Sequence, residues 1–399
     1  MVQRNAPRPA PLPRAIWVLG TVSFLSDVAS DMIYPLLPLF LTTVLGAGAL
    51  ALGTIEGIAE TTASLLKVAS GILSDRTKRR SPIVVAGYTV SSLMRPLMGL
   101  AWAWPQILVL RFLDRIGKGV RTSPRDALIA DVTPEAQQGQ AFGLQIGLDH
   151  GGAVVGPLVG WLLVGPLALT LRTAFMLAAV PGALTILVLV VGLREPQRRT
   201  APSATRPPLW SNWGNLGPAF KRYLVPTGVL ALASSSDAFL LLQLDRAGLS
   251  AGQITLLWAA FNLIRASFSV LAGRLVDRWG PRPLLIGSWV LYGLVYLAFA
   301  LTASPSWLAP IFLVYGLFYG FAESSELAWV ARLVPATLRG SGFGFYHALI
   351  GMTALPASVG FGVVMARFGA PVAFMSEAML TFLGVLLLLG VPTRPQAQG

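Results

Sequence analysis

The chain has 399 residues, of which 54% are hydrophobic and 12% are charged, and its mean hydropathy is +0.67. Soluble domains carry about 25% charged residues, so the composition excludes an ordinary soluble protein and indicates an integral membrane protein. The sequence has no cysteine and only two histidines, so neither thiolate chemistry nor a metal site or other cofactor is expected. The net charge of +13 is not accompanied by a nucleic-acid-binding module, so the expected partners are a lipid bilayer and a small molecule, not nucleic acid.

Apolar stretches long enough to cross a bilayer, about 20 residues each, follow one another along the chain. Residues 1–14 are rich in arginine and proline and predict a disordered basic tail, and the apolar run after them is too long for a signal-peptide core. Residues 194–219 form the one long polar connector, and 393–399 a second tail. We therefore predict an all-α membrane protein with an N-terminal six-helix bundle (15–193), a linker (194–219) and a C-terminal six-helix bundle (220–392). The twelve spans are expected near 15–42, 48–74, 82–101, 105–131, 139–164, 171–193, 220–244, 251–276, 283–303, 307–333, 340–366 and 371–392.

The distribution of lysine and arginine predicts the orientation. If the N-terminus is cytoplasmic, nineteen basic residues fall on that side of the membrane, and only Arg172, Arg246 and Arg367 fall on the other. Cytoplasmic loops carry an excess of basic residues, so both termini are expected in the cytoplasm, with the protein in the inner membrane.

The two halves of the chain resemble each other. GILSDRTKRR (71–80) and GRLVDRWGPR (273–282) each connect the second and third spans of their half. At nearly the same offset, ALIADVTPEAQQGQAFG (127–143) matches AWVARLVPATLRGSGFG (328–344) at six positions. Two matches at nearly one offset indicate an internal duplication, and parallel six-span repeats with a central site are a transporter architecture.

These loops carry a signature that resembles the major facilitator superfamily, and the resemblance covers nearly the whole chain. The signature is Gly71, Asp75 and Arg76 in the first half, with Lys78 where glycine is usual, and it recurs in the second half as Asp277 and Arg278. The resemblance implies two pseudo-symmetric bundles and a conformational switch in which this loop is linked to an acidic residue at the end of the fourth span, here Asp131.

Motifs in three spans resemble those of twelve-span drug/proton antiporters. The first span contains PLLP (35–38), and the fourth has Arg115-Ile-Gly-Lys118-Gly119 where the family has R-x-x-q-G. The resemblance places that arginine near the proton-coupling site. The fifth span carries the antiporter pattern of small residues and proline that permits close helix packing and a bend, as Gly152, Gly156, Pro157 and Gly160.

Charged residues within the predicted spans are the candidate site, because a charge at mid-membrane costs at least about 2.5 kcal/mol. Seven charged residues between Arg111 and Asp126 fall within an arc of roughly 140° on the fourth helix. For proton coupling we predict Asp31, Asp27, Arg115, Glu56 and Glu60, and for substrate binding Lys118, Arg111, Asp149, His150, Asp237, Arg265, Glu323 and His347. In the coupling hypothesis, ionised Asp31 pairs with Arg115 and the protonated form releases it. The structural alternative is that the charges only neutralise one another.

Three functions follow from these residues. The leading one is a proton-coupled antiporter, expected to be monomeric, that exports a small organic compound by alternating access. The second is a carrier for an anionic metabolite or metal chelate that uses the basic fourth helix. The third is a membrane assembly factor that transports nothing. An enzyme is not expected, because no nucleophile, base and orienting residue stand out.

Overall fold

The computed structural model describes residues 12–76, 79–134, 137–193, 213–334 and 338–391. Throughout these ranges the regular structure is helical, as the composition predicts. Each of the twelve predicted spans contains a helical segment, and eight segments are long and apolar enough to cross a membrane. The other four, in the second, fourth, seventh and eighth positions, contain embedded charges or are interrupted.

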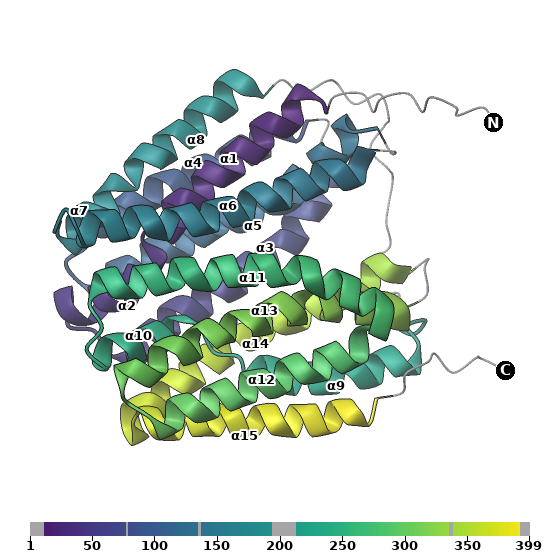
Figure 1. Cartoon of the computed structure of the whole chain (residues 1–399). Helices are drawn as coiled ribbons and strands as arrows, with labels where there is room; N and C mark the ends of the chain where they lie inside the picture. The colour runs from purple at the N-terminus through teal and green to yellow at the C-terminus, as the bar shows by residue number, and fades with distance from the viewer. Residues whose placement is uncertain (1–11, 77–78, 135–136, 194–212, 335–337, 392–399) are drawn as a thin grey trace, which may run out of the picture.

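The helices form two bundles, one from each half of the chain (Figure 1). The first bundle contains α1 (Arg14–Asp31), η1 (Tyr34–Leu36), α2 (Leu37–Leu39), η2 (Phe40–Val44), α3 (Ala49–Arg76), α4 (Ser81–Leu97), η3 (Met98–Leu100), α5 (Trp104–Val132), α6 (Gln138–Val164), α7 (Leu171–Leu177) and α8 (Ala179–Gly192). The second contains α9 (Pro218–Leu232), α10 (Ala238–Arg246), α11 (Ala251–Trp279), α12 (Pro281–Leu301), α13 (Pro305–Leu333), α14 (Arg339–Phe368) and α15 (Ala370–Leu389). The start of α1 and the end of α15 lie at one end of the molecule, here named the terminal end; the opposite end is the distal end (Figure 1).

Three segments that the sequence predicts as continuous helices are interrupted, the sixth span only at Ala178, between α7 and α8. The first span changes to 3-10 and π geometry after Asp31, where Pro35 and Pro38 cannot donate backbone hydrogen bonds. The seventh span divides into α9 and α10 at the sequence Ser-Ser-Ser-Asp, 234–237. Serine and aspartate side chains offer the backbone alternative hydrogen bonds, which explains why a helix is weak there.

A buried carboxylate from another helix holds the break in the seventh span. Glu377 of α15 accepts the backbone N–H of Ser235 at 3.1 Å and the Ser235 hydroxyl at 3.0 Å. This pair satisfies a backbone donor that the interruption would otherwise leave unpaired inside the bundle. The break is therefore stabilised by tertiary contacts, and it directs the next residues, Ser236 and Asp237, toward the interior.

The two bundles meet along α3 with α14 and along α6 with α11. Glycines make the first contact close: a Cβ at Gly57 would lie 3.0 Å from the Leu355 Cα, and one at Gly362 would lie 2.8 Å from the Ala49 carbonyl oxygen. These contacts lie in the distal half. Toward the terminal end, by contrast, Gly143 and Gly147 of α6 have nothing within 4 Å of a Cβ position. The close contacts between the bundles thus lie in the distal half and continue to the middle of α3, whereas Gly143 and Gly147 face open space toward the terminal end.

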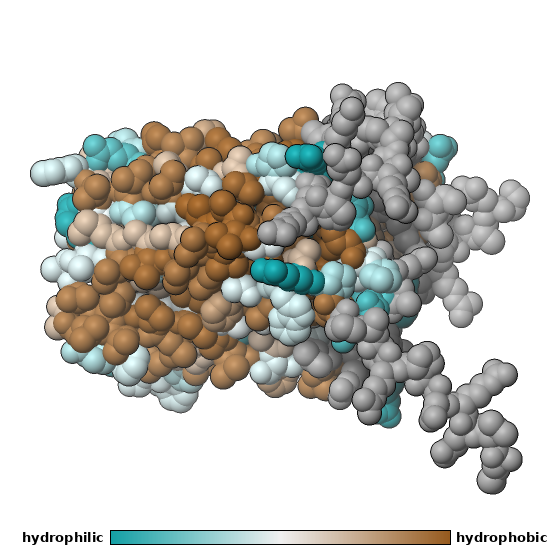
Figure 2. All heavy atoms as spheres, turned by 90° about the horizontal axis from the view of Figure 1, so that it is seen from above, coloured by the Kyte–Doolittle hydropathy of each residue, from teal (hydrophilic) through white to brown (hydrophobic). Residues whose placement is uncertain are grey.

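The outer surface suits a bilayer. Figure 2 shows hydrophobic residues over most of the visible face, with hydrophilic residues gathered near its ends. Large apolar side chains such as Val191, Leu386 and Met379 are two-thirds exposed. In water such a continuous apolar surface would drive association, so lipid is its natural environment.

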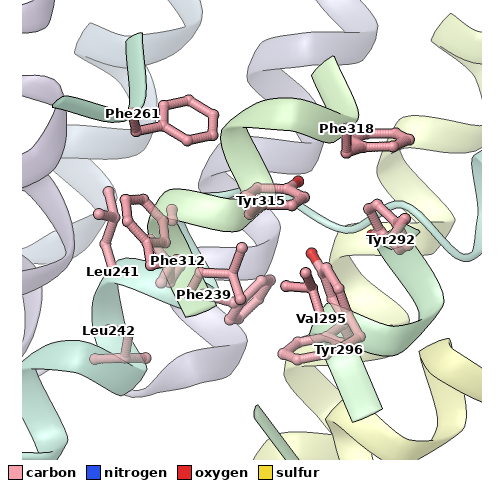
Figure 3. Packing of buried hydrophobic residues seen from close by; sticks show 14 of the residues in the cluster. Phe239, Leu241, Leu242, Phe261, Tyr292, Val295, Tyr296, Phe312, Tyr315 and Phe318 are labelled. Carbon is pink, nitrogen blue, oxygen red and sulfur yellow. The ribbon is translucent and has the colours of Figure 1, made fainter. Parts of the chain in front are cut away.

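Aromatic side chains fill the interior of the second bundle. Rings from α10, α11, α12 and α13 meet there, among them Phe239, Phe261, Tyr292, Tyr315 and Phe318 (Figure 3). Tyr315 stacks on Phe318 with ring centroids 5.8 Å apart, and Tyr292 lies 4.8 Å from the same phenylalanine. This packed core leads directly to the wall of the central cavity.

Candidate functional site

A cavity of about 440 Å³ lies between the two bundles. Among the described residues, only Tyr34, Glu56 and Glu60 reach it from the first bundle, and the second bundle supplies the rest of the wall. The wall combines five carboxylates with aromatic rings and hydroxyls, a chemistry that suits a small organic ligand. Its charged and aromatic residues are Tyr34, Glu56, Glu60, Tyr223, Asp237, Arg265, Trp289, Phe318, Tyr319, Glu323, Glu326 and Tyr346.

Asp237, at the break before α10, is held by phenols. Tyr315 donates to Asp237 Oδ1 at 2.7 Å, and Tyr319 donates to the same oxygen at 3.0 Å and to Oδ2 at 3.2 Å. The two tyrosines are four residues apart on α13, so they lie on one face of the helix. No ion pair joins Asp237 to a described lysine, arginine or histidine.

Glu326 of α13 is also held by neutral donors. Its Oε1 accepts the indole N–H of Trp289 at 3.0 Å, and its Oε2 accepts a short hydrogen bond from the hydroxyl of Tyr346. Among the described side chains no cation pairs with it. Glu326 therefore presents a carboxylate to the cavity whose partners are aromatic rather than cationic.

Two other carboxylates of the wall are neutralised. Arg265 of α11 pairs with Glu323 at 3.1 Å and lies 4.8 Å from the ring centroid of Tyr319. Glu56 of α3 pairs with Arg111 at 3.0 Å. Both arginines are thus already paired with carboxylates of the protein.

The charged face of α5 turns into the first bundle. Asp114 is at its centre, fully buried, with Arg95 at 3.1 Å, Arg111 at 3.6 Å and Arg115 at 3.7 Å. Nearer the terminal end, Arg125 pairs with Asp126 at 2.9 Å. None of these residues lies on the cavity wall, so this network ties α5 to α3 and α4 and does not face the cavity.

Asp31 forms a contact that the coupling hypothesis does not include. Its Oδ1 accepts the indole N–H of Trp258, on α11 of the other bundle, at 3.2 Å. The predicted pair with Arg115 is not formed between these two described residues, because that arginine is directed to Asp114. Asp31 therefore joins the two bundles through a hydrogen bond in this conformation.

The antiporter motif of the fifth span packs against the same part of α1. A Cβ at Gly152 would lie 2.9 Å from the Asp27 Cβ, one at Gly156 3.0 Å from the Asp31 Cβ, and one at Gly160 2.5 Å from the Met32 carbonyl oxygen. Pro157 lies inside α6 between these contacts. The motif thus brings the α6 backbone directly against the turn of α1 that carries the two aspartates.

The remaining predicted site residues are placed as follows. Of the predicted substrate residues, Asp237, Arg265 and Glu323 line the cavity, whereas Lys118, Arg111, Asp149, His150 and His347 do not; of the predicted coupling residues, Glu56 and Glu60 line it. Asp149 accepts from Gln145 at 2.8 Å and lies 3.6 Å from Arg125. His150 is half-buried and His347 is exposed.

The predicted switch residues are partly visible. Asp131 forms an ion pair of 2.6 Å with Arg80, the last residue of the first-half loop signature. Gly71 lies on α3 with Ser123 of α5 beside it, and Arg278 is exposed. The side chains of Asp75, Arg76 and Asp277 are outside the described part of the structure.

Sequence reasoning assigned no role to several residues of this region. Glu377 is a single carboxylate in a predicted span, and such an embedded charge marks a candidate functional residue. The spacing of Tyr315 and Tyr319 marks one helix face, but it is also ordinary core spacing. Nothing in the sequence distinguishes Trp289 or Tyr346 from packing residues, since only the fold brings them to Glu326.

Comparisons with known proteins agree with this architecture. The model of the Major Facilitator Superfamily matches residues 19–244 and 227–399. The chain is 30% identical over 394 residues to an uncharacterised MFS-type transporter, MJ1317, of Methanocaldococcus jannaschii, with 97% of each chain covered. It is 26% identical to a probable 4-methylmuconolactone transporter of Cupriavidus pinatubonensis, with 97% of this chain and 91% of the relative covered.

A part of the chain also resembles a drug-resistance protein. Multidrug resistance protein MdtH of Photorhabdus laumondii is 30% identical over 184 residues, which cover 45% of this chain and 43% of the relative. Among solved structures, a bacterial homologue of the human lysosomal transporter Spinster, in an inward-facing and unoccupied conformation, superimposes with a TM-score of 0.71 at 18% identity, covering 94% of each chain. The family model spans nearly the whole chain and the fold agrees with it, so this protein is a member of the Major Facilitator Superfamily of membrane transporters.

Proposed function

We propose that this protein is a proton-coupled antiporter that exports a small organic compound across the cytoplasmic membrane by alternating access. The observation that carries the proposal is the central cavity, which is closed at the distal end and holds carboxylates that form no ion pair with a described cation. The partial similarity to a multidrug resistance protein supports export, although other relatives are named for other compounds.

The orientation follows from the basic residues. Arg79 and Arg80 of the first loop signature and Arg282 of the second lie at the terminal end. The positive-inside rule assigns this end to the cytoplasm. In this orientation the separated halves of the bundles open to the cytoplasm and the close glycine contacts shut the outer side. Substrate then enters from within the cell.

The bond between Asp31 and Trp258 offers a coupling device. The bond joins the bundles while the outer side is closed, so it breaks when they part there, and the surroundings of Asp31 differ between the two conformations. A carboxylate whose proton affinity differs between two conformations couples proton binding to the conformational change. For export, the proton must be taken up outside and released inside. Asp27, Lys118 and Arg95 are the charged groups that act on Asp31 electrostatically.

A competing function is an anion carrier that uses the fourth helix. This proposal has less support, because Lys118 and Arg111 lie off the cavity wall and Arg111 is already paired with Glu56. A non-transporting assembly factor has less support as well, because a plugged interior would suit it better than an open cavity.

Substitution of Asp31 tests the coupling. Compounds that raise the unfolding temperature of the purified protein would be assayed in proteoliposomes with an imposed pH gradient. Asp31→Asn should abolish the pH-gradient-driven flux while binding persists, because asparagine keeps the size and cannot exchange the proton. Asp126→Asn is the matched control, since it removes an aspartate that is 44% exposed and paired on its own helix. Full proton-driven flux in Asp31→Asn would contradict the coupling role.

A further inference from the structure

The charges on the cavity wall do not cancel. Five carboxylates reach the wall, and Arg265 is the only lysine or arginine among the described lining residues. Arg265 is paired with Glu323, and Arg111 pairs with Glu56 from behind the wall. Three carboxylates therefore form no ion pair with a described cation: Glu60, Asp237 and Glu326. Lys67 and Arg115 still act on Glu60 electrostatically, and Arg265 acts on Asp237.

These three carboxylates differ in their surroundings. Asp237 is engaged by the hydroxyls of Tyr315 and Tyr319, and three hydrogen bonds fix it in the helix break. Glu60 is exposed, and its contact is the Ser64 hydroxyl at 3.4 Å. Glu326 is half-buried among rings, so its charge is less screened by water than that of Glu60 and it can bind a partner more strongly.

The surfaces around Glu326 suit a cation with an apolar body. The rings of Trp289 and Tyr346 hold its two oxygens, and Tyr223 and Phe318 line the same cavity. An aromatic face attracts a cation, and it also buries apolar groups. Since the present partners of Glu326 are neutral donors, an arriving cation does not have to displace a protein cation.

We propose that the cavity selects organic cations and that Glu326 is the residue that binds the positive charge of the substrate, with the apolar part of the substrate against the aromatic wall. The inference rests on the proposed transport function, but binding at this site can be tested without transport. An anion would meet a wall with a surplus of negative charge. A metal ion is not favoured, since no cluster of three or more candidate metal ligands is found among the described residues.

Two probes of nearly identical shape and opposite charge test the selectivity. Tetraphenylphosphonium and tetraphenylborate would each be measured by equilibrium dialysis against the full-length protein in detergent, at one ionic strength. The expected result is saturable binding of tetraphenylphosphonium and, for tetraphenylborate, only the partition found with empty micelles. Saturable binding of tetraphenylborate, or saturable binding of neither probe, would overturn the proposal.

Substitution of Glu326 tests the assignment to this residue. Glu326→Gln should weaken tetraphenylphosphonium binding at least about tenfold, because it removes the charge but keeps the shape. The control is Asp245→Asn, which removes one negative charge from the same bundle at a position away from the cavity. Equal affinity of Glu326→Gln and the unsubstituted protein, or an equal loss in the control, would overturn the assignment.

A second variant covers the case in which Glu326→Gln does not fold. Tyr346→Phe removes the hydroxyl that competes for Glu326 and keeps the ring, so tetraphenylphosphonium should bind more tightly. Unchanged or weaker binding would count against Glu326 as the anchor.

The two proposals fail in different ways. If tetraphenylphosphonium binds and depends on Glu326 but is not moved by an imposed pH gradient in proteoliposomes, the site stands and proton-coupled export fails. If the pH gradient drives flux of other compounds while the cation does not bind, export stands and the cation site fails.

Discussion

At the scale of single residues, Asp114 is the most constrained carboxylate of the first bundle. It is fully buried on α5, and three arginines from two helices lie within 3.7 Å of its oxygens. A buried ionic group contributes little net stability compared with an apolar core, but removing one partner leaves the others uncompensated. The network is thus needed to keep arginines inside the bundle at all.

Removal of this one charge should therefore be costly. We expect Asp114→Asn to lower the free energy of unfolding by about 3–5 kcal/mol, since asparagine leaves Arg95, Arg111 and Arg115 without their shared anion. Denaturation in mixed micelles, followed by circular dichroism, measures it. Asp126→Asn, whose carboxylate is 44% exposed, should cost less than about 1 kcal/mol. A loss no larger than that of this control would show that the network is dispensable.

At the scale of elements, the contact of α1 with α6 depends on glycines. The backbone of α6 approaches the carbonyls of α1 so closely that a Cβ at Gly160 would lie 2.5 Å from the Met32 carbonyl oxygen. Without a hydrophobic driving force between helices in lipid, such close backbone packing stabilises their association. The sequence motif therefore has a direct packing explanation next to Asp27 and Asp31.

An alanine scan of α6 separates packing from helix propensity. Gly160→Ala should lower the free energy of unfolding by about 1–3 kcal/mol, because the backbone carbonyl it meets cannot move aside easily. Gly147→Ala, on the same helix with nothing within 4 Å, should be neutral or stabilising, since alanine favours helix. The unfolding temperatures of the two variants measure the difference, and equal temperatures would argue against close packing as the role of the motif.

At the scale of the whole molecule, the arrangement of the bundles predicts one-sided access. The distal contacts of α3 with α14 close the cavity on that side. The exposed side chains of Glu60 and Glu323 lie on the side of the cavity nearer the terminal end. Because the chain has no cysteine, a single introduced thiol reports on its own position without background.

Thiol labelling checks this access. Ala354→Cys, on the cavity wall, should react with a membrane-impermeant maleimide from the cytoplasmic side in inside-out vesicles and several-fold more slowly in right-side-out vesicles. Ala59→Cys lies on α3 with 1% exposure and should remain unlabelled in both. Faster labelling of Ala354→Cys from the outside would mean that the orientation, or the closed side, is the reverse of that proposed.

How much of this could be predicted differs between levels. The twelve helical segments and the two halves follow from apolar run length and the internal duplication, both of which are local properties of the chain. The embedded carboxylates were visible as well, because any charge in an apolar run stands out. The interruption of the seventh span was not predicted, since three serines and an aspartate within an apolar region are compatible with either state.

The sequence by itself determined the membrane environment, the family and the presence of a charged face on the fourth helix. Only the tertiary structure decided what that face meets: Asp114, Arg115 and their partners turn into the first bundle, while the cavity takes its carboxylates from α3, α13 and the break before α10. The physical reason is rotation. Periodicity fixes which residues share a face of a helix, but the packing of neighbouring helices, through glycines such as Gly117 against the Gly87 carbonyl oxygen, fixes the direction in which that face points.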